Sequence, residues 1–236
     1  MKKVKEKGME IVFLIAACVS ILSVALICIF LFMNGIPAIK EIGFFNFVGG
    51  KIWKPGNMIY PLPAVMVSCQ RPGEKANIIT IAWTGTVCTN PAMLYISVRP
   101  ERYSYDIIRE TGEFVVNLTT EKLAKATDYC GVRSGRDVDK FKEMHLTEEP
   151  SVQIHVPGIA ECPVNIECRV KNILELGSHH MFVAEVLQVH VDESYLDEKG
   201  KFHLNDTGLM AYSHGEYKTL GETIGTFGYS VRKKRR

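Results

Sequence analysis

The stretch NIITIAWTGTVCTNPAMLYISVRPERYSYDIIRETGEFVVN, residues 77–117, decides the fold of this chain. Its β-branched, aromatic and aliphatic residues are typical of strands, which we expect over residues 77–87 and 94–98. A charged break follows, and then a short helix over residues 105–110, which Gly112 ends as a left-handed cap. Another strand begins after this glycine. The pattern therefore predicts a mainly β domain with short helices.

Groups that bind phosphate collect in the charged break. Arg99, Arg102, Tyr103 and Ser104 come directly before the predicted helix. Free N–H groups at a helix N-terminus, a hydroxyl group and nearby guanidinium groups together suit a phosphate. An arginine on a loop is otherwise a solvated surface charge. The break is therefore a candidate phosphate site.

The order of these motifs resembles the flavin reductase-like family, and within it the flavoredoxins. Further matches are GEFVVN at residues 112–117, CGVRSGRDVDKF at 130–141 and GSHHMFVAEV at 177–186. The resemblance covers about residues 51–231 and implies an FMN-binding split β-barrel. One departure is Ala92, which stands where the family usually has the second of two prolines. The residues that match the family pattern in the deciding stretch are Asn77, Thr80, Ala82-Trp83, Cys88, Asn90-Pro91, Ser97-Val98-Arg99 and Tyr103-Ser104.

The resemblance also implies how FMN is bound. Arg99 and Ser104, with the start of the helix, would bind the phosphate, and the segment around Trp83 would present backbone groups to the polar edge of the ring. Cys88 would lie beside the ring, although a small core residue is the alternative reading, as a core position is for Trp83. The cofactor-binding residues that follow are Asn77, Thr80, Ile81, Ala82, Trp83, Cys88, Ser97, Val98, Arg99, Tyr103 and Ser104.

His179 is the candidate catalytic residue. It matches the histidine of the family's Gly-Asp-His motif, with Ser178 in the Asp position, and the resemblance implies that it lies near the ring and supports nicotinamide binding or electron transfer. The alternative is a polar turn residue. Lys140 would close over the cofactor region, or else form a surface ion pair. A metal site from His179, His180 and His190 lacks a further ligand that we can place, so no metal is expected.

An apolar run without charges, residues 11–33, precedes the domain. As a helix it would be about 34 Å long, enough to cross a hydrocarbon core of about 30 Å. No A-x-A site closes the run, and it exceeds the apolar region of a typical signal peptide, so we expect one membrane-spanning helix that ends at residues 34–37. The predicted organisation is a basic flank (1–10), a transmembrane helix (11–33), a linker (34–50), an FMN-binding domain (51–231) and a basic tail (232–236).

Two arguments disagree about the side of the membrane on which the domain lies. The Lys-rich N-terminus predicts a cytoplasmic flank and a domain outside. Seven cysteines, an odd number with no CxxC or zinc-type spacing, and the need for reduced nicotinamide indicate the cytosol instead. The sequence leaves the side open.

Charge is unevenly distributed along the chain. The formal net charge of +2 includes +2 from the first ten residues and +5 from the last five, which leaves −5 for the rest. Nucleic acid is therefore not an expected partner. The basic tail is either solvated or rests on anionic lipid headgroups. The resemblance implies a homodimer with the flavin near the subunit interface.

Two functions share every residue named above. In the first, the protein is an oxidoreductase that passes electrons from NADH or NADPH through FMN to a small-molecule acceptor or a redox partner. In the second, it is an FMN electron carrier that a partner protein reduces. No Gly-x-Gly-x-x-Gly follows a predicted strand, so a separate Rossmann domain for the nicotinamide is not expected. A flavin-free interaction module is a third possibility, which the motifs disfavour.

Overall fold

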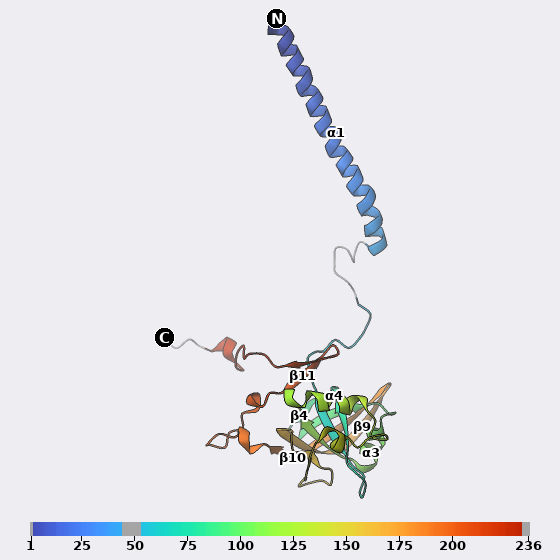
Figure 1. The fold of residues 1–236 in the computed structure, drawn as a ribbon, viewed down its shortest axis with the longest axis vertical. Coiled ribbons are helices and arrows are strands. Elements are labelled where there is room, and N and C mark those ends of the chain that lie inside the picture. Colours follow the sequence, from blue (N-terminus) through green and yellow to red (C-terminus); the bar gives the residue numbers. More distant parts are fainter. Residues whose placement is uncertain (1, 44–52, 233–236) are drawn as a thin grey trace. The chain divides into compact units, whose positions relative to one another are not determined.

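The computed structural model describes residues 2–43 and 53–232, and the chain falls into two units, Met1–Met58 and Ile59–Arg236 (Figure 1). The first unit contains the helix α1 (Lys2–Ile42). The second contains every strand and the remaining helices of the described residues. The C-terminal part of the predicted linker (44–50), the first two residues of the predicted domain and the tail residues 233–236 lie outside the described residues.

The helix α1 is longer than the sequence predicts. Its segment Lys7–Glu41 is long and apolar enough to cross a membrane, although a signal sequence near an N-terminus can meet the same criteria of length and composition. The predicted end at residues 34–37 is wrong, since α1 continues to Ile42 with Pro37 inside it. Asn34 stays helical because its side-chain amide donates to the Phe30 carbonyl at 2.8 Å. Pro37 removes one backbone donor, a limited loss in a helix of 41 residues.

The second unit is built on a seven-stranded antiparallel sheet with the order β3-β2-β6-β9-β10-β5-β4. Apolar and polar residues alternate over residues 164–176, which predicts a half-buried strand, and the structure has a strand with these bounds. The strands of this sheet are β2 (Val65–Cys69), β3 (Asn77–Ile81), β4 (Thr84–Thr89), β5 (Ala92–Val98), β6 (Glu113–Leu118), β9 (Val164–Leu176) and β10 (His179–Val191).

The predicted strand over residues 77–87 is in fact two strands, and this break shapes the barrel. β3 and β4 are separated by Ala82 and Trp83 alone, yet they lie at opposite ends of the strand order. Two residues of extended chain span only about 10 Å. The sheet must therefore curl until its two edges approach each other at this crossing, which is the split in the barrel. At this crossing the Trp83 carbonyl accepts from Ser97 N of β5 at 2.8 Å, next to the pairing of β4 with β5.

The curled sheet encloses the main hydrophobic core, which includes Phe114, Phe182 and Ile96, each 0% exposed. A second cluster, around Met66 and Ile78, packs under the helices α4 and α5. The remaining elements are α3 (Tyr103–Thr111), α4 (Ala124–Val132), α5 (Lys140–Met144), the strands β1 (Leu62–Pro63), β7 (Glu148–Glu149), β8 (Gly158–Ile159), β11 (Met210–Ser213) and β12 (Glu216–Thr219), and 3-10 turns at Glu121–Leu123, Glu193–Tyr195, Leu204–Thr207 and Tyr229–Val231.

The end of a helix can be predicted from the sequence when the residues that form its cap are neighbours in the chain. Gly112 ends α3 with φ of 68°, and its N–H donates to the Ile108 carbonyl at 2.9 Å, which confirms the predicted cap. The sequence also offers Thr119 or Thr120 as the N-cap of a helix over residues 121–129, and this prediction is wrong. Thr119 instead donates its hydroxyl to the Ala64 carbonyl at 2.6 Å, and Thr120 makes no side-chain cap bond. The Thr119 hydroxyl therefore bonds to a residue far away in the sequence and not to the helix that follows it.

Two carboxylates fasten the loop between β7 and β8 to the sheet. The Glu167 side chain, 0% exposed on β9, accepts from the backbone N–H groups of Val152 at 2.8 Å and Gln153 at 2.7 Å. His190 on β10 contacts the same carboxylate at 2.5 Å. Burial favours the neutral acid, but the Val152 N–H, His190 and the Gln153 N–H outweigh it and hold the pKa of Glu167 below its ordinary value.

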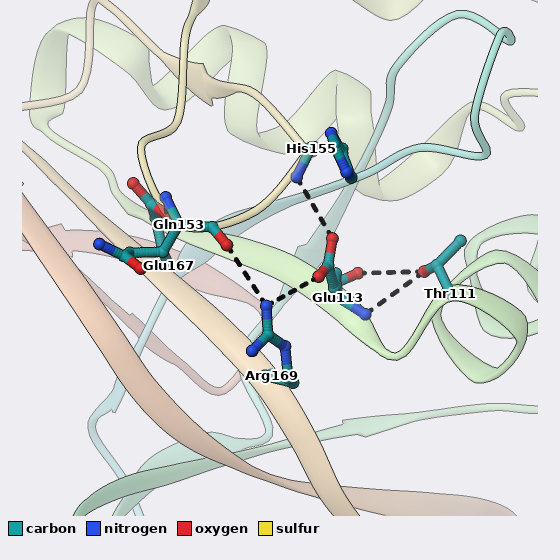
Figure 2. Close-up of polar contacts among 6 residues, drawn as sticks. All are labelled: Thr111, Glu113, Gln153, His155, Glu167 and Arg169. Atoms are coloured by element: carbon teal, nitrogen blue, oxygen red, sulfur yellow. Dashed lines mark hydrogen bonds and ion pairs between the residues drawn. The ribbon is translucent and has the colours of Figure 1, made fainter.

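The second carboxylate belongs to Glu113 on β6 (Figure 2). It accepts from the His155 backbone N–H and from the Arg169 guanidinium, both at 3.2 Å. Arg169 also donates to the Gln153 carbonyl at 3.3 Å. Because irregular backbone needs partners when it packs against a sheet, these bonds explain how the loop keeps one conformation.

Candidate functional site

Two adjoining hollows lie where the barrel splits. The first has a volume of about 350 Å³ and the second about 290 Å³. Ile79, Arg102 and Gly131 line both of them, so the two form one elongated site. Ligand sites typically measure 300–1,000 Å³, and the joined volume falls well inside this range.

The first hollow is bounded by backbone from both edges of the split barrel. The β3–β4 crossing and the end of β5 form one wall, and α4 forms another. Gly131 of α4 approaches Thr80 closely, since a Cβ atom on it would lie 3.2 Å from the Thr80 Cβ. The hairpin of β11 and β12 supplies Tyr212, Gly215 and Tyr217, and Ala64, Arg102 and His179 complete the lining. The full lining is Ala64, Ile79–Trp83, Ser97–Arg99, Arg102, Asp128, Gly131, Val132, His179, Tyr212, Gly215 and Tyr217.

His179 lies against Trp83 in this hollow. Their rings are stacked, with centroids 5.9 Å apart and an interplanar angle of 11°. Burial lowers the pKa of His179, and the positive charges of Arg99 and Arg102 lower it further. The imidazole is therefore neutral at neutral pH. His180 does not line the hollow; its Nδ1 lies 2.8 Å from the Tyr105 hydroxyl instead, as alternation along a strand requires.

The second hollow is strongly basic. Arg102, Arg133, Arg136 and Lys140 line it, against one acidic residue, Glu101. The start of α3 also faces it through Tyr103 and Ser104, so a helix N-terminus adds its partial positive charge. Four cations and a helix start in one hollow are groups whose chemistry suits a phosphate.

Lys140 is the most informative of these cations, because it is 3% exposed. Its ammonium group donates to the carbonyls of Ile78 at 2.5 Å and Cys130 at 2.8 Å. No ion pair with a carboxylate is found for it among residues 2–43 and 53–232. Burial lowers the pKa of Lys140 to about 8. One N–H remains for a ligand, so a surface ion pair is the wrong reading of this residue.

Gly135 and Asn77 show how tightly the second hollow is built. A Cβ atom on Gly135 would lie 2.0 Å from the Asn77 Oδ1 and 2.9 Å from the Tyr103 Cδ1. Only glycine lets the loop between α4 and α5 approach this closely. Asn77 Nδ2 donates to the Ser104 hydroxyl at 2.8 Å, which fixes this hydroxyl at the start of α3.

Most of the residues predicted from sequence come together here, but they divide between the hollows. Arg99 and Ser104 were expected to share the phosphate; they line different hollows, and Arg99 Nε pairs with Glu101 Oε1 at 2.7 Å. Cys88, on β4, lines neither. The roles of Arg99, Ser104 and Cys88 in FMN binding stay predictions. The first hollow holds Thr80, Ile81, Ala82, Trp83, Ser97, Val98, Arg99 and His179, and the second holds Asn77, Tyr103 and Ser104.

Sequence reasoning missed two groups of lining residues. Arg133, Ser134 and Arg136 belong to the CGVRSGRDVDKF motif, where basic residues beside serine and glycine are a usable phosphate signal. Tyr212 and Tyr217 flank a His-Gly turn far along the chain, and no local signal connects them with the site.

Comparison with known proteins agrees with this fold. The family model described as the flavin reductase like domain matches residues 58–221. An uncharacterised protein of Archaeoglobus fulgidus is 34% identical over 165 residues, which are 70% of this chain and 91% of that protein.

Two solved structures are also similar. Flavoredoxin of Desulfovibrio vulgaris (Miyazaki F) superimposes with a TM-score of 0.71 at 28% identity, over 77% of this chain and 99% of the other. Flavoredoxin from Methanosarcina acetivorans gives a TM-score of 0.69 at 32% identity, over 78% and 100%. The chain belongs to the flavin reductase-like family and has its split-barrel fold, with α1 as an addition.

Proposed function

We propose that this protein is an oxidoreductase that binds FMN along the two hollows and passes electrons from NADH or NADPH through it to an acceptor. The observation that carries the proposal is the buried, unpaired ammonium group of Lys140 in the basic second hollow. A phosphate there would put the flavin ring in the first hollow, beside Trp83 and His179. FMN, when bound, supplies the two-electron chemistry.

In this proposal the chain's own residues bind and orient. Lys140, Arg102 and Arg136 neutralise the phosphate, and the backbone around Trp83 meets the polar edge of the ring. His179 is neutral and therefore does not repel the positive charge that a nicotinamide develops as it gives up hydride. The second candidate is an electron carrier, which the similarity to two flavoredoxins favours.

The test uses the full-length chain in detergent. The purified protein should carry FMN, and NADH or NADPH added without oxygen should bleach its yellow absorbance. His179→Ala should slow this bleaching about 10–100-fold, the weak end for a positioned acid–base group, while FMN stays bound. The matched control is His180→Ala, because His180 faces Tyr105 and not the hollow. Protein without flavin would refute the proposal, and bound flavin that neither nicotinamide bleaches would favour the carrier.

We further propose that the flavin domain is a homodimer, and the C-terminal segment (residues 220–232) supports this. Three of its apolar side chains stand free in the single chain, with Ile224 95%, Phe227 106% and Val231 81% exposed. Covering a side chain of this size stabilises by roughly 1.5–3 kcal/mol. The family resemblance makes a second copy of the chain the expected cover.

The dimer can be measured by sedimentation of residues 59–236, which form a unit of their own. The parent fragment should sediment as a dimer at micromolar concentration. Replacing Ile224 and Phe227 by Ser should shift it toward the monomer, whereas Val152→Ser, a change at another exposed apolar residue that lines neither hollow, should not. A parent fragment that stays monomeric would contradict the proposal.

A further inference from the structure

The hairpin of β11 and β12 forms part of the wall of the first hollow, although it lies outside the seven-stranded sheet. Tyr212, Gly215 and Tyr217 from this hairpin line the hollow. Its turn is tight, because Ser213 pairs with Glu216 and the two residues between, His214 and Gly215, have φ of 49° and 84°. The hairpin is thus a small, stiff flap at the edge of the site.

Few hydrogen bonds fasten this flap to the rest of the domain. Its apolar contacts are the buried residues Met210 and Ala211 at its base and the ring of Tyr60, whose centroid lies 4.7 Å from that of His214. Within its own three-stranded sheet, β11 pairs with β1 over two residues only, and β12 is the outer strand. At its base, Met210 N donates to the Thr119 carbonyl at 3.3 Å. Among the hydrogen bonds of the described residues, one joins a hairpin side chain to another element: the Tyr217 hydroxyl donates to Asp128 Oδ1 on α4 at 3.3 Å.

This bond connects two sides of the first hollow, since Tyr217 and Asp128 both line it. Tyr212 packs between them and the opposite wall, with ring centroids 5.9 Å from Tyr217 and 6.5 Å from Trp83. A planar ligand bound beside Trp83 would therefore lie next to the tyrosines of the hairpin. Burial and the Asp128 charge raise the pKa of Tyr217 to about 12, so its hydroxyl keeps the proton that it donates.

We infer that the β11–β12 hairpin is a gate over the first hollow, and that the bond from Tyr217 to Asp128 is the latch that sets how fast a flavin enters and leaves. The inference rests on the proposed function for the identity of the ligand. It gives Tyr217 and Asp128 a positioning role, in which they act through the hairpin. A well-fastened gate keeps FMN bound between turnovers, and a loose one lets it exchange as a substrate would.

A gate and a direct contact have different kinetic signatures. Loss of the bond between Tyr217 and Asp128 makes the open conformation of the hairpin more populated. The rate constants for flavin entry and exit then rise together, and the dissociation constant changes little. Loss of a contact with the bound flavin raises mainly the rate of exit. Both rates can be followed by stopped flow, from the fluorescence of FMN mixed with the flavin-free full-length chain in detergent.

We expect Tyr217→Phe to raise both rates about 2–10-fold, the net contribution of a typical hydrogen bond, because this bond is long at 3.3 Å and exposed to solvent; the dissociation constant should stay within about twofold of the parent. Asp128→Ala should do the same. Asp128→Asn should have a smaller effect, because its amide oxygen still accepts a hydrogen bond. Tyr195→Phe is the control, since Tyr195 lies in the 3-10 turn Glu193–Tyr195 and does not line the hollow. A slower exit alone, a faster exit alone, or unchanged rates would overturn the inference.

Hydrogen exchange tests the latch without any flavin. In Tyr217→Phe, the backbone amides of β11 and β12 should exchange about 2–10-fold faster than in the parent, and those of β9 and β10 should not change. Unchanged exchange in the hairpin would refute the latch. If the parent binds no FMN, the proposed function fails, and this second measurement still decides whether the bond fastens the hairpin.

Discussion

Lys140→Met is expected to raise the dissociation constant of FMN about 10–150-fold. This range corresponds to the roughly 1.5–3 kcal/mol of a hydrogen bond between charged groups. The lysine is buried, and two of its three N–H groups are already used by the carbonyls of Ile78 and Cys130, so its position does not depend on the ligand. Fluorescence titration of the flavin-free protein measures the change.

Lys142→Met is the matched control, because Lys142 lies on the same helix and is exposed. It should bind FMN within about twofold of the parent. Equal affinities for both variants and the parent would place the phosphate away from Lys140. Methionine has nearly the same length as lysine, and a urea unfolding curve of each variant shows whether the fold is retained.

The same lysine predicts a pH dependence whose sign follows from its pKa of about 8. A bound phosphate favours the protonated lysine and raises its pKa in the complex. Affinity should therefore be constant from pH 7 to about 8 and fall above that, by up to about tenfold per pH unit. Lys140→Met should be flat over the same interval. A parent that binds equally at pH 7 and pH 9.5 would contradict the assignment.

Glu167→Ala is expected to have the largest effect on stability, about 2–5 kcal/mol off the free energy of unfolding. It leaves the backbone N–H groups of Val152 and Gln153 without their acceptor, at roughly 1–3 kcal/mol each, and opens a cavity at a fully buried position. Urea unfolding of residues 59–236 measures the loss. Glu175→Ala, an exposed change on the same strand, should stay within about 0.5 kcal/mol.

Acid should narrow this difference. The folded pKa of Glu167 lies below its ordinary 4.5, so its contribution is complete above pH 4.5 and is lost as the pH falls through the folded value. The gap between parent and Glu167→Ala should thus be widest near neutral pH and narrow in acid. A gap that is equally wide below the folded pKa would show that the carboxylate charge is not what holds the loop.

Part of this fold could be predicted because the interactions that form it join residues close together in the sequence. The alternation over residues 164–176 gives β9, and Gly112 ends α3 because a left-handed cap needs no distant partner. The separated motifs were enough to identify the family, because their order along the chain is itself sequence information. The opposite directions of His179 and His180 also follow from strand geometry.

Other features depend on partners that local sequence does not name. The division of residues 77–87 into strands at opposite edges of the sheet comes from which strands pair with β3 and β4. Lys140 reads as a surface charge within its own helix, and it is buried because α5 packs over Ile78 and Cys130. The predicted threonine caps are wrong for the same reason, since the Thr119 hydroxyl bonds to the carbonyl of Ala64, a residue far away in the sequence, and not to the start of the helix.

The site itself combines both kinds of information. Residues 77–104 were predictable as its centre because the motif is contiguous, but the basic lining continues into residues 133–140 and the wall of the first hollow into Tyr212 and Tyr217. Curling of the sheet brings these segments together, and the free energy of that curling comes from burying a core to which six of the seven strands contribute. Sequence thus determined which chemistry the chain carries, and only the tertiary structure decided which charges and rings meet in one hollow.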